Sequence, residues 1–307
     1  MSVLTRETAR PAIAGRHVRL PRYVYLLSLL MAVVGGVAAA LTFLVPGVLQ
    51  GPPVTNGNAR GTALVMLALA TPTLVLSIWA EWRGSRRARL FWLGSLFYLA
   101  YNAFLLLFLT PFNSLFLIYV AAESLGLFSI FALVFASRDY PTRDEAERIP
   151  VRGLAVLVWV IVVFNTLAWL QVVVPAVFSD DPGSFLDGLG VTTNAIYVQD
   201  LTVWLPLMTL GAWWMWHRRP LGIFLTGSWL AFGFIEAIGI AVDQWFGHRA
   251  DPLSPHASTG VIPLMIALAV VNLVGLYFYV RRRSTDTSVR EVGALGSEEG
   301  RPWPIPH

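Results

Sequence analysis

The stretch LGIFLTGSWLAFGFIEAIGIAVDQW, from Leu221 to Trp245, decides the fold of this chain. A helix crosses the hydrocarbon core of a bilayer, about 30 Å thick, with about 20 apolar residues, and this stretch is long enough. Near its middle it carries a carboxyl group, Glu236. The pattern indicates a membrane helix in which Glu236 faces a partner or a cavity rather than lipid.

Seven more stretches of similar length and apolarity occur in the chain. Of its 307 residues 56% are hydrophobic and 13% are charged, whereas a soluble domain carries about 25% charged residues. We therefore expect an all-α, polytopic membrane bundle of eight transmembrane helices, and the lipid bilayer as its surroundings. The expected spans are Val24–Val45, Thr62–Trp82, Leu90–Leu109, Leu115–Phe135, Leu154–Val174, Ile196–Trp216, Leu221–Trp245 and Val261–Val280.

The basic residues indicate how the bundle is oriented. All 22 are arginine. If the N-terminus is cytoplasmic, every arginine except Arg60 and Arg249 falls in a segment on the cytoplasmic side. Because cytoplasmic loops retain Lys and Arg, this asymmetry predicts a cell-membrane protein with both termini inside. Membrane topology thus accounts for the arginine runs. This argues against a nucleic-acid partner and is compatible with contact to anionic lipid.

The chain divides into three parts. Residues 1–22 form a polar, arginine-rich cytoplasmic arm, residues 23–283 form the membrane domain, and residues 284–307 are expected to be a disordered cytoplasmic tail.

The two halves of the membrane domain, 23–137 and 152–283, look alike. Pro72, Trp79 and Trp82 have the same spacing as Pro206, Trp213 and Trp216. With four helices in each half, this predicts a parallel 4+4 internal duplication about an axis along the membrane normal. The alternative is that these tryptophans are ordinary anchors at the membrane interface. Both prolines lie inside predicted helices and are expected to kink them.

Several stretches resemble one family. They are Asn58-Ala59-Arg60-Gly61-Thr62, Trp92-Leu93-Gly94, Tyr98-x2-Tyr101-Asn102, Thr110-Pro111-Phe112-Asn113 and Arg218-Arg219-Pro220-x-Gly222. They are similar to those of a family of uncharacterised bacterial multi-pass membrane proteins. The resemblance implies a fold and a membrane location, and it implies no activity.

Composition excludes several kinds of chemistry. The chain has no cysteine, so disulfides, thiol nucleophiles and cysteine-bound metals are absent. It has no lysine for a Schiff base, and none of its five histidines lies in the middle of a predicted span. We therefore predict no cofactor, no metal and no catalytic residue.

Polar residues within the spans suggest a site. Counted from the outer ends of their helices, five of them lie at a similar depth, about 10–17 Å below the outer boundary at about 1.5 Å per residue. Carriers place their sites near the bilayer midplane, between repeats. The five residues are Asn102, Glu123, Asn165, Glu236 and Asn272.

The role of the two glutamates stays open at this stage. A carboxylate at the centre of a membrane helix costs about 2.5–3.5 kcal/mol on insertion scales. Glu123 and Glu236 therefore either carry protons, bind a cation, or serve as structural acids that hydrogen-bond to Asn102 or Asn272.

A second polar group is expected near the outer face. Asp243 follows Glu236 by seven residues on the same helix face, and Asp200 begins the sixth span. His248 and His256 follow soon after, although their spacing is not that of a metal motif. Asp200 also suits the first turn of a helix, where the helix dipole favours an acid.

Three functions are compatible with these residues. The first is a carrier or a binder of a small molecule or lipid, with its site in the midplane layer. The second is a structural membrane subunit that works with a partner protein and binds no ligand. The third is an outer-face enzyme, for which the sequence offers no nucleophile–base motif.

Overall fold

The computed structural model of this protein describes residues 19–137 and 140–281, and the regular elements in these ranges are all helices. Only the last four residues of the expected arm, 1–22, fall in the described part. The expected tail, 284–307, lies outside it.

The first half of the chain contains α1 (Arg22–Leu44), α2 (Pro53–Val65), η1 (Met66–Ala70), α3 (Thr71–Trp82), α4 (Ala88–Phe108) and α5 (Phe116–Ala136). The short helix α6 (Arg143–Glu147) follows. The second half contains α7 (Val151–Val177), η2 (Ser184–Leu186), α8 (Ala195–Gln199), η3 (Asp200–Trp204), α9 (Leu205–Trp216), α10 (Pro220–Ala250), η4 (Thr259–Val261) and α11 (Ile262–Val280).

Within the described residues, seven helices are long and apolar enough to cross a membrane, which makes this a multi-pass membrane protein. They match seven of the eight predicted spans. The remaining prediction, Ile196–Trp216, does form a continuous helical run through α8, η3 and α9, but it is not among the seven. Gln199 and Asp200 near one end and three tryptophans at the other make this run less apolar.

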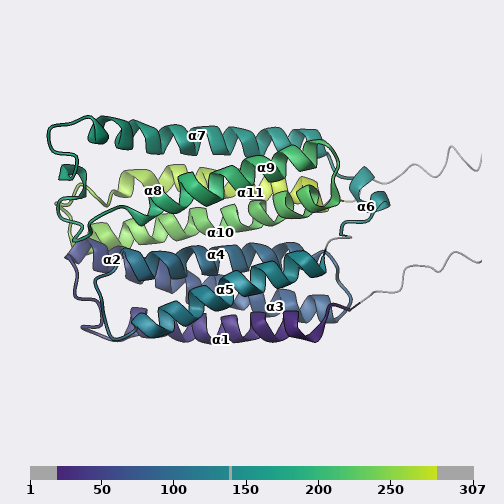
Figure 1. The fold of residues 1–307 in the computed structure, drawn as a ribbon, viewed down its shortest axis with the longest axis horizontal. Coiled ribbons are helices and arrows are strands. Elements are labelled where there is room, and N and C mark those ends of the chain that lie inside the picture. Colours follow the sequence, from purple (N-terminus) through teal and green to yellow (C-terminus); the bar gives the residue numbers. More distant parts are fainter. Residues whose placement is uncertain (1–18, 138–139, 282–307) are drawn as a thin grey trace, which may run out of the picture.

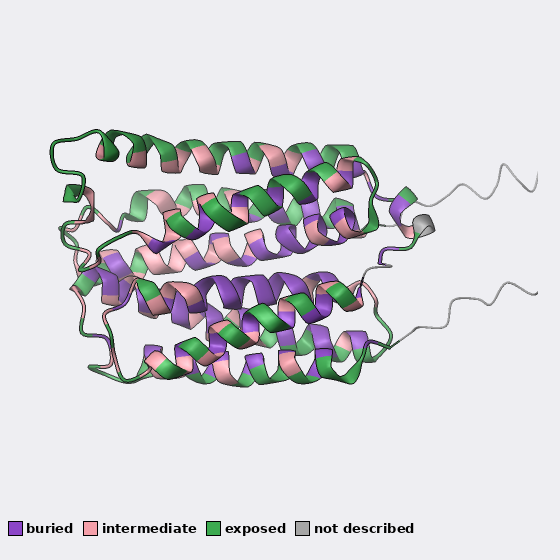
Figure 2. Cartoon of the chain, viewed as in Figure 1, coloured by how far each residue is buried: buried purple, intermediate pink, exposed green. Residues whose placement is uncertain are grey.

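The two halves lie one on the other, and α4 of the first half and α10 of the second lie where they meet (Figure 1). In the 18-residue stretch of each helix used for its hydropathy, 78% of the residues are buried in α4 and 67% in α10, against 22% in α7. The outward faces of α5 and α7 expose large apolar side chains, such as Leu117 at 78% and Phe164 at 72% (Figure 2). Exposed faces of this kind suit contact with lipid.

Two glycines of α2 allow the closest approach between the halves. A Cβ on Gly57 would lie 2.6 Å from the carbonyl oxygen of Phe246, and one on Gly61 would lie 2.5 Å from Cα of Asp243. Small residues four apart on one helix face let two membrane helices pack backbone to backbone. The pair Gly57 and Gly61 thus holds α2 directly against the end of α10.

The contact between α4 and α10 also depends on glycine. A Cβ on Gly94 would lie 2.8 Å from the carbonyl oxygen of Ser228 and 2.7 Å from Cβ of Ala231. In the other direction, a Cβ on Gly239 of α10 would lie 2.6 Å from the hydroxyl oxygen of Tyr98. Each of the two central helices therefore has a glycine where the other helix leaves no room for a side chain.

Each half contains one π-helical turn, directly before the proline that the sequence places inside a span. The residue before Pro72, Thr71, donates its N–H to the carbonyl of Met66, and the residue before Pro206, Leu205, donates to Asp200. Proline has no N–H of its own, and a π turn is one way to absorb that loss. The predicted irregularity at both prolines is therefore a five-residue π turn.

A buried ion pair joins α3 to α4 in the first half. Arg89 donates from Nη2 and Nε to Oε1 of Glu81, at 2.7 and 3.1 Å, and the Tyr25 hydroxyl donates to Oε2. Glu81 is fully buried and Arg89 is 5% exposed. By spacing from the shared prolines and glycines, the second half has Met215 and Gly222 at these two positions.

Replacing Gly61 by alanine should destabilise the bundle by about 1–3 kcal/mol, because the new methyl group meets the backbone of α10. The matched control is Gly153→Ala on α7, where a Cβ would meet nothing within 4 Å. That change should be neutral or stabilising by about 0.5–1 kcal/mol, since alanine favours helix. Denaturant unfolding in detergent measures both, and equal stability of the two variants would refute the close contact.

Glu81→Met alone should cost about 3–5 kcal/mol, because it removes the buried carboxylate to which Arg89 donates two hydrogen bonds. The double variant Glu81→Met/Arg89→Leu removes both charges and should recover most of that loss. The same unfolding measurement on both single variants and the double variant gives the coupling. Additive losses would show that the two side chains do not stabilise each other.

Candidate functional site

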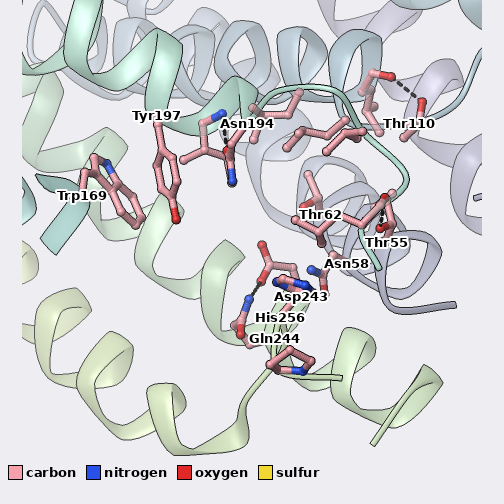
Figure 3. A pocket seen from close by; sticks show the side chains of 18 residues that line it. Thr55, Asn58, Thr62, Thr110, Trp169, Asn194, Tyr197, Asp243, Gln244 and His256 are labelled. Atoms are coloured by element: carbon pink, nitrogen blue, oxygen red, sulfur yellow. Dashed lines mark hydrogen bonds between the residues drawn. The ribbon is translucent and has the colours of Figure 1, made fainter. Parts of the chain in front are cut away.

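A cavity of about 350 Å³ opens between the two halves, at the end of the bundle opposite α6. One side consists of Thr55, Asn58 and Thr62 of α2 and the end of α4. The other side consists of Asp243 and Gln244 of α10, Trp169 of α7, and the segments around Asn194, Tyr197 and His256 (Figure 3). Both halves of the chain are therefore needed to form it.

Asp243 supplies the carboxyl group of this cavity. The contact of Gly61 with its backbone fixes it against α2, and its Oδ1 accepts a hydrogen bond from Nε2 of Gln244 at 3.2 Å. The Gln244 side chain is itself held by the N–H of Ser258, at 3.0 Å. Among the described residues that line the cavity, Asp243 is the only carboxylate and none is an arginine.

Aromatic and amide groups face Asp243 across the cavity. Asn194 begins α8 by accepting the N–H of Ile196 at 3.0 Å, and Tyr197 follows on the first turn. The ring of Tyr197 lies 4.8 Å, centroid to centroid, from that of Trp169. Figure 3 shows the Asn194 side chain and the Tyr197 hydroxyl pointing toward the space beside Asp243.

One polar atom of the wall is unsatisfied. Oδ1 of Asn58 is buried and has no hydrogen-bond partner among the described residues. It lies so close to Gly247 that a Cβ there would be 1.7 Å from it. Oδ1 of Asn58 is therefore enclosed in the close contact between α2 and α10, away from the open space of the cavity.

The predicted outer-face group is brought together in part. Asp243 and His256 line the same cavity, and Nε2 of His256 hydrogen-bonds to the carbonyl oxygen of Asp187 at 2.6 Å. Asp200 lies behind the wall, where its Oδ2 accepts the indole N–H of Trp169 at 2.8 Å. His248 lies further along α10 and does not line the cavity. In the described ranges, no three His, Asp or Glu side chains gather as a metal site would require.

Of the five residues predicted as a midplane layer, Asn102 and Glu236 are joined by a hydrogen bond. Nδ2 of Asn102 donates to Oε2 of Glu236 at 3.4 Å and to the carbonyl of Tyr98 at 3.0 Å. Asn272 turns to its own helix and donates to the carbonyl of Leu268. The remaining two are Glu123, whose Oε2 is buried without a hydrogen-bond partner in the described part of the chain, and Asn165, half-buried on α7.

Glu236 and Asp243 connect the two predicted groups. They lie two turns apart on α10, a rise of about 10 Å. The Asn102–Glu236 contact therefore lies deeper in the bundle than the cavity and on the same central helix. A polar route from the cavity toward the middle of the bundle would pass along this face of α10.

Sequence reasoning missed the residues that complete the cavity wall. Trp169 and Tyr197 carry no motif, and their importance depends on how α7 and α8 pack. Asn58 could have been noticed as a polar residue at the start of the stretch 58–62, which carries the family resemblance. Glu81 could have been noticed as an acid beside the arginine-rich turn, eight residues before Arg89.

Comparison of the chain with protein-family models, with curated proteins and with solved structures finds no match. The family resemblance seen in the sequence is therefore unsupported by these comparisons, and its bacterial origin stays a prediction. The class that the fold defines is a multi-pass helical membrane protein in contact with the lipid bilayer.

Replacing Asn102 by leucine should destabilise the protein by about 1–3 kcal/mol, because Glu236 loses a hydrogen-bond donor inside the bundle. Glu236→Gln keeps an oxygen that accepts from Asn102, so it should cost less than about 1 kcal/mol. Thermal unfolding in detergent compares the two. If Glu236→Gln costs as much as Asn102→Leu, the hydrogen bond is not what stabilises this position.

Proposed function

We propose that this protein binds a small organic cation or polar amine in the cavity around Asp243 and acts as its membrane carrier. The observation that carries the proposal is a single carboxylate in a cavity of about 350 Å³ with aromatic walls. Trp and Tyr faces attract cations through their ring quadrupoles, and a carboxylate supplies the opposite charge. Cavities of this size suit small molecules.

The polar groups of the wall support the same class of ligand. The amide of Asn194 and the hydroxyl of Tyr197 can orient hydrogen-bonding groups around a bound amine. Transport further requires a path beyond the cavity, and Glu236 with Asn102 lies two turns deeper on α10. The midplane residues are in this proposal the inner continuation of the site.

The proposal includes a topology. We take the run Ala195–Trp216 to be an eighth span, because α7 and α10 both run away from the α6 end and the chain must return between them (Figure 1). The arginine distribution then supports both termini and α6 on the cytoplasmic side, in the cell membrane. The cavity opens to the outside.

The duplication is part of the same proposal. It is supported by the two π turns before Pro72 and Pro206, which have equal length and equal position, and by the pairing of α4 with α10 at the centre. Carriers built from repeats bind their substrates at the interface between the repeats. The cavity around Asp243 lies at that interface.

A second candidate is a structural subunit that binds a partner membrane protein and no ligand. It is favoured by the Asn102–Glu236 hydrogen bond and by the bond of Asn272 to its own helix, since polar groups so satisfied can serve packing alone.

Native mass spectrometry of protein purified in mild detergent tests the proposal. Wild-type protein should retain a small molecule of fixed mass, and Asp243→Asn should lose it because the counter-charge is gone. Asp251→Asn, a carboxylate change in the loop directly after α10, is the matched control and should retain it. The melting temperature with added alkylamines and tetraalkylammonium ions gives a second readout, in which only Asp243→Asn should lose its response.

A protein that is bare in all three forms and does not respond to any of these cations would favour the structural subunit instead. A ligand retained equally by Asp243→Asn and Asp251→Asn would refute the carboxylate of Asp243 as its binding group.

A further inference from the structure

A second cavity, of about 240 Å³, lies at the α6 end of the bundle, far from Asp243. Three arginines from three different segments line it: Arg87 precedes α4, Arg148 follows α6 and Arg281 follows α11. Arginines more than sixty positions apart in the chain thus line one cavity, which the topological role of arginine does not require.

Among the described residues that line this cavity, basic side chains outnumber acidic ones. Glu145 is the only carboxylate among them, and its Oε2 lies 3.8 Å from Nη1 of Arg86. The same oxygen also accepts the N–H of Thr142 at 2.8 Å, as the cap of α6. Glu145 is therefore engaged by Arg86 and by the cap, while three arginines line the cavity.

The floor of the cavity is built from two buried tyrosines. The Tyr279 hydroxyl donates to the carbonyl oxygen of Ile223 at 3.0 Å, which ties α11 to α10. Tyr140 is held by the ring of Phe224, edge-on at 5.6 Å, and by the guanidinium of Arg86 at 5.3 Å. Burial raises the pKa of Tyr140, so its hydroxyl stays protonated and can donate a hydrogen bond.

From this arrangement we infer that the cavity lined by Arg87, Arg148 and Arg281 binds a phosphate group, as carried by the headgroup of an anionic phospholipid. Guanidinium groups bind phosphate oxygens in paired hydrogen bonds. Basic pockets between membrane helices at the cytoplasmic side are suited to anionic headgroups, and this one lies beside the ends of α4 and α11. A lipid held here would fasten α6 to the membrane domain.

Lipid binding to the full-length protein tests the inference. Native mass spectrometry with added phosphatidylglycerol should show a bound lipid, with phosphatidylcholine bound more weakly because its headgroup has no net charge. The double variant Arg87→Gln/Arg281→Gln should weaken phosphatidylglycerol binding by about tenfold or more. Arg281→Gln alone, beyond the last helix, should give a smaller loss without affecting folding.

The control must remove the same charge from the same end of the bundle. Arg83→Gln/Arg219→Gln does so at two exposed arginines that do not line the cavity. It should bind phosphatidylglycerol like the wild type. Equal losses in the two double variants would overturn the inference and leave only a general attraction between a basic face and an acidic membrane.

Soluble phosphate distinguishes the source of the group. Inorganic phosphate and pyrophosphate are added to lipid-depleted protein and to both double variants, and the shift in melting temperature is measured. Stabilisation that depends on Arg87 and Arg281, without preference for phosphatidylglycerol, supports a phosphate site filled by a soluble ligand. If neither lipid nor soluble phosphate depends on these arginines, the inference is wrong.

Discussion

The close approach of α10 to α2 and α4 is the constraint on which the rest of the structure depends. In a bilayer the hydrophobic effect does not drive one apolar helix onto another, so association depends on close packing and on polar contacts. Here the packing is provided by Gly57, Gly61 and Gly94, each opposite backbone or small side-chain atoms of α10. The same contact that joins the halves also sets Asp243 at the edge of the cavity. Stability and the candidate site therefore share one set of residues.

The features that the sequence predicted well are those that depend on composition and on distance along the chain. Seven spans could be predicted because an apolar run is recognised from its length and hydropathy alone. A local irregularity near Pro72 and Pro206 could be predicted because proline has no N–H to donate. Of the predicted outer-face group, Asp243 and His256 line one cavity, and a function for this group stays a prediction. The run Ala195–Trp216, predicted as an eighth span, is not among the seven because Gln199, Asp200 and its tryptophans make it less apolar than the others.

What could not be predicted depends on helix rotation and on which helices are neighbours. Glu123, Asn165 and Asn272 were predicted to share a depth with Glu236, and a shared depth alone does not determine which side chains meet. Asn272 bonds to its own helix, and Asn102 is the partner that reaches Glu236. Trp169 and Tyr197 line the cavity because α7 and α8 lie beside the end of α10, and the sequence does not show that arrangement. The pair Glu81–Arg89 could not be predicted for the same reason. Arg89 belongs to an arginine-rich turn, yet its side chain is buried against Glu81.

The π turns have a consequence for the history of the chain. A π turn is equivalent to a helix with one residue inserted, and here both halves carry it at the same place, five residues long and directly before a proline. Under the proposed duplication, the insertion was already present in the ancestral four-helix unit and was copied with it. By position, the pair Glu81–Arg89 corresponds to Met215 and Gly222 in the second half, so under the same proposal this difference arose after the duplication. The π turns would then be a feature that both halves inherited, and the buried charges a later difference between them.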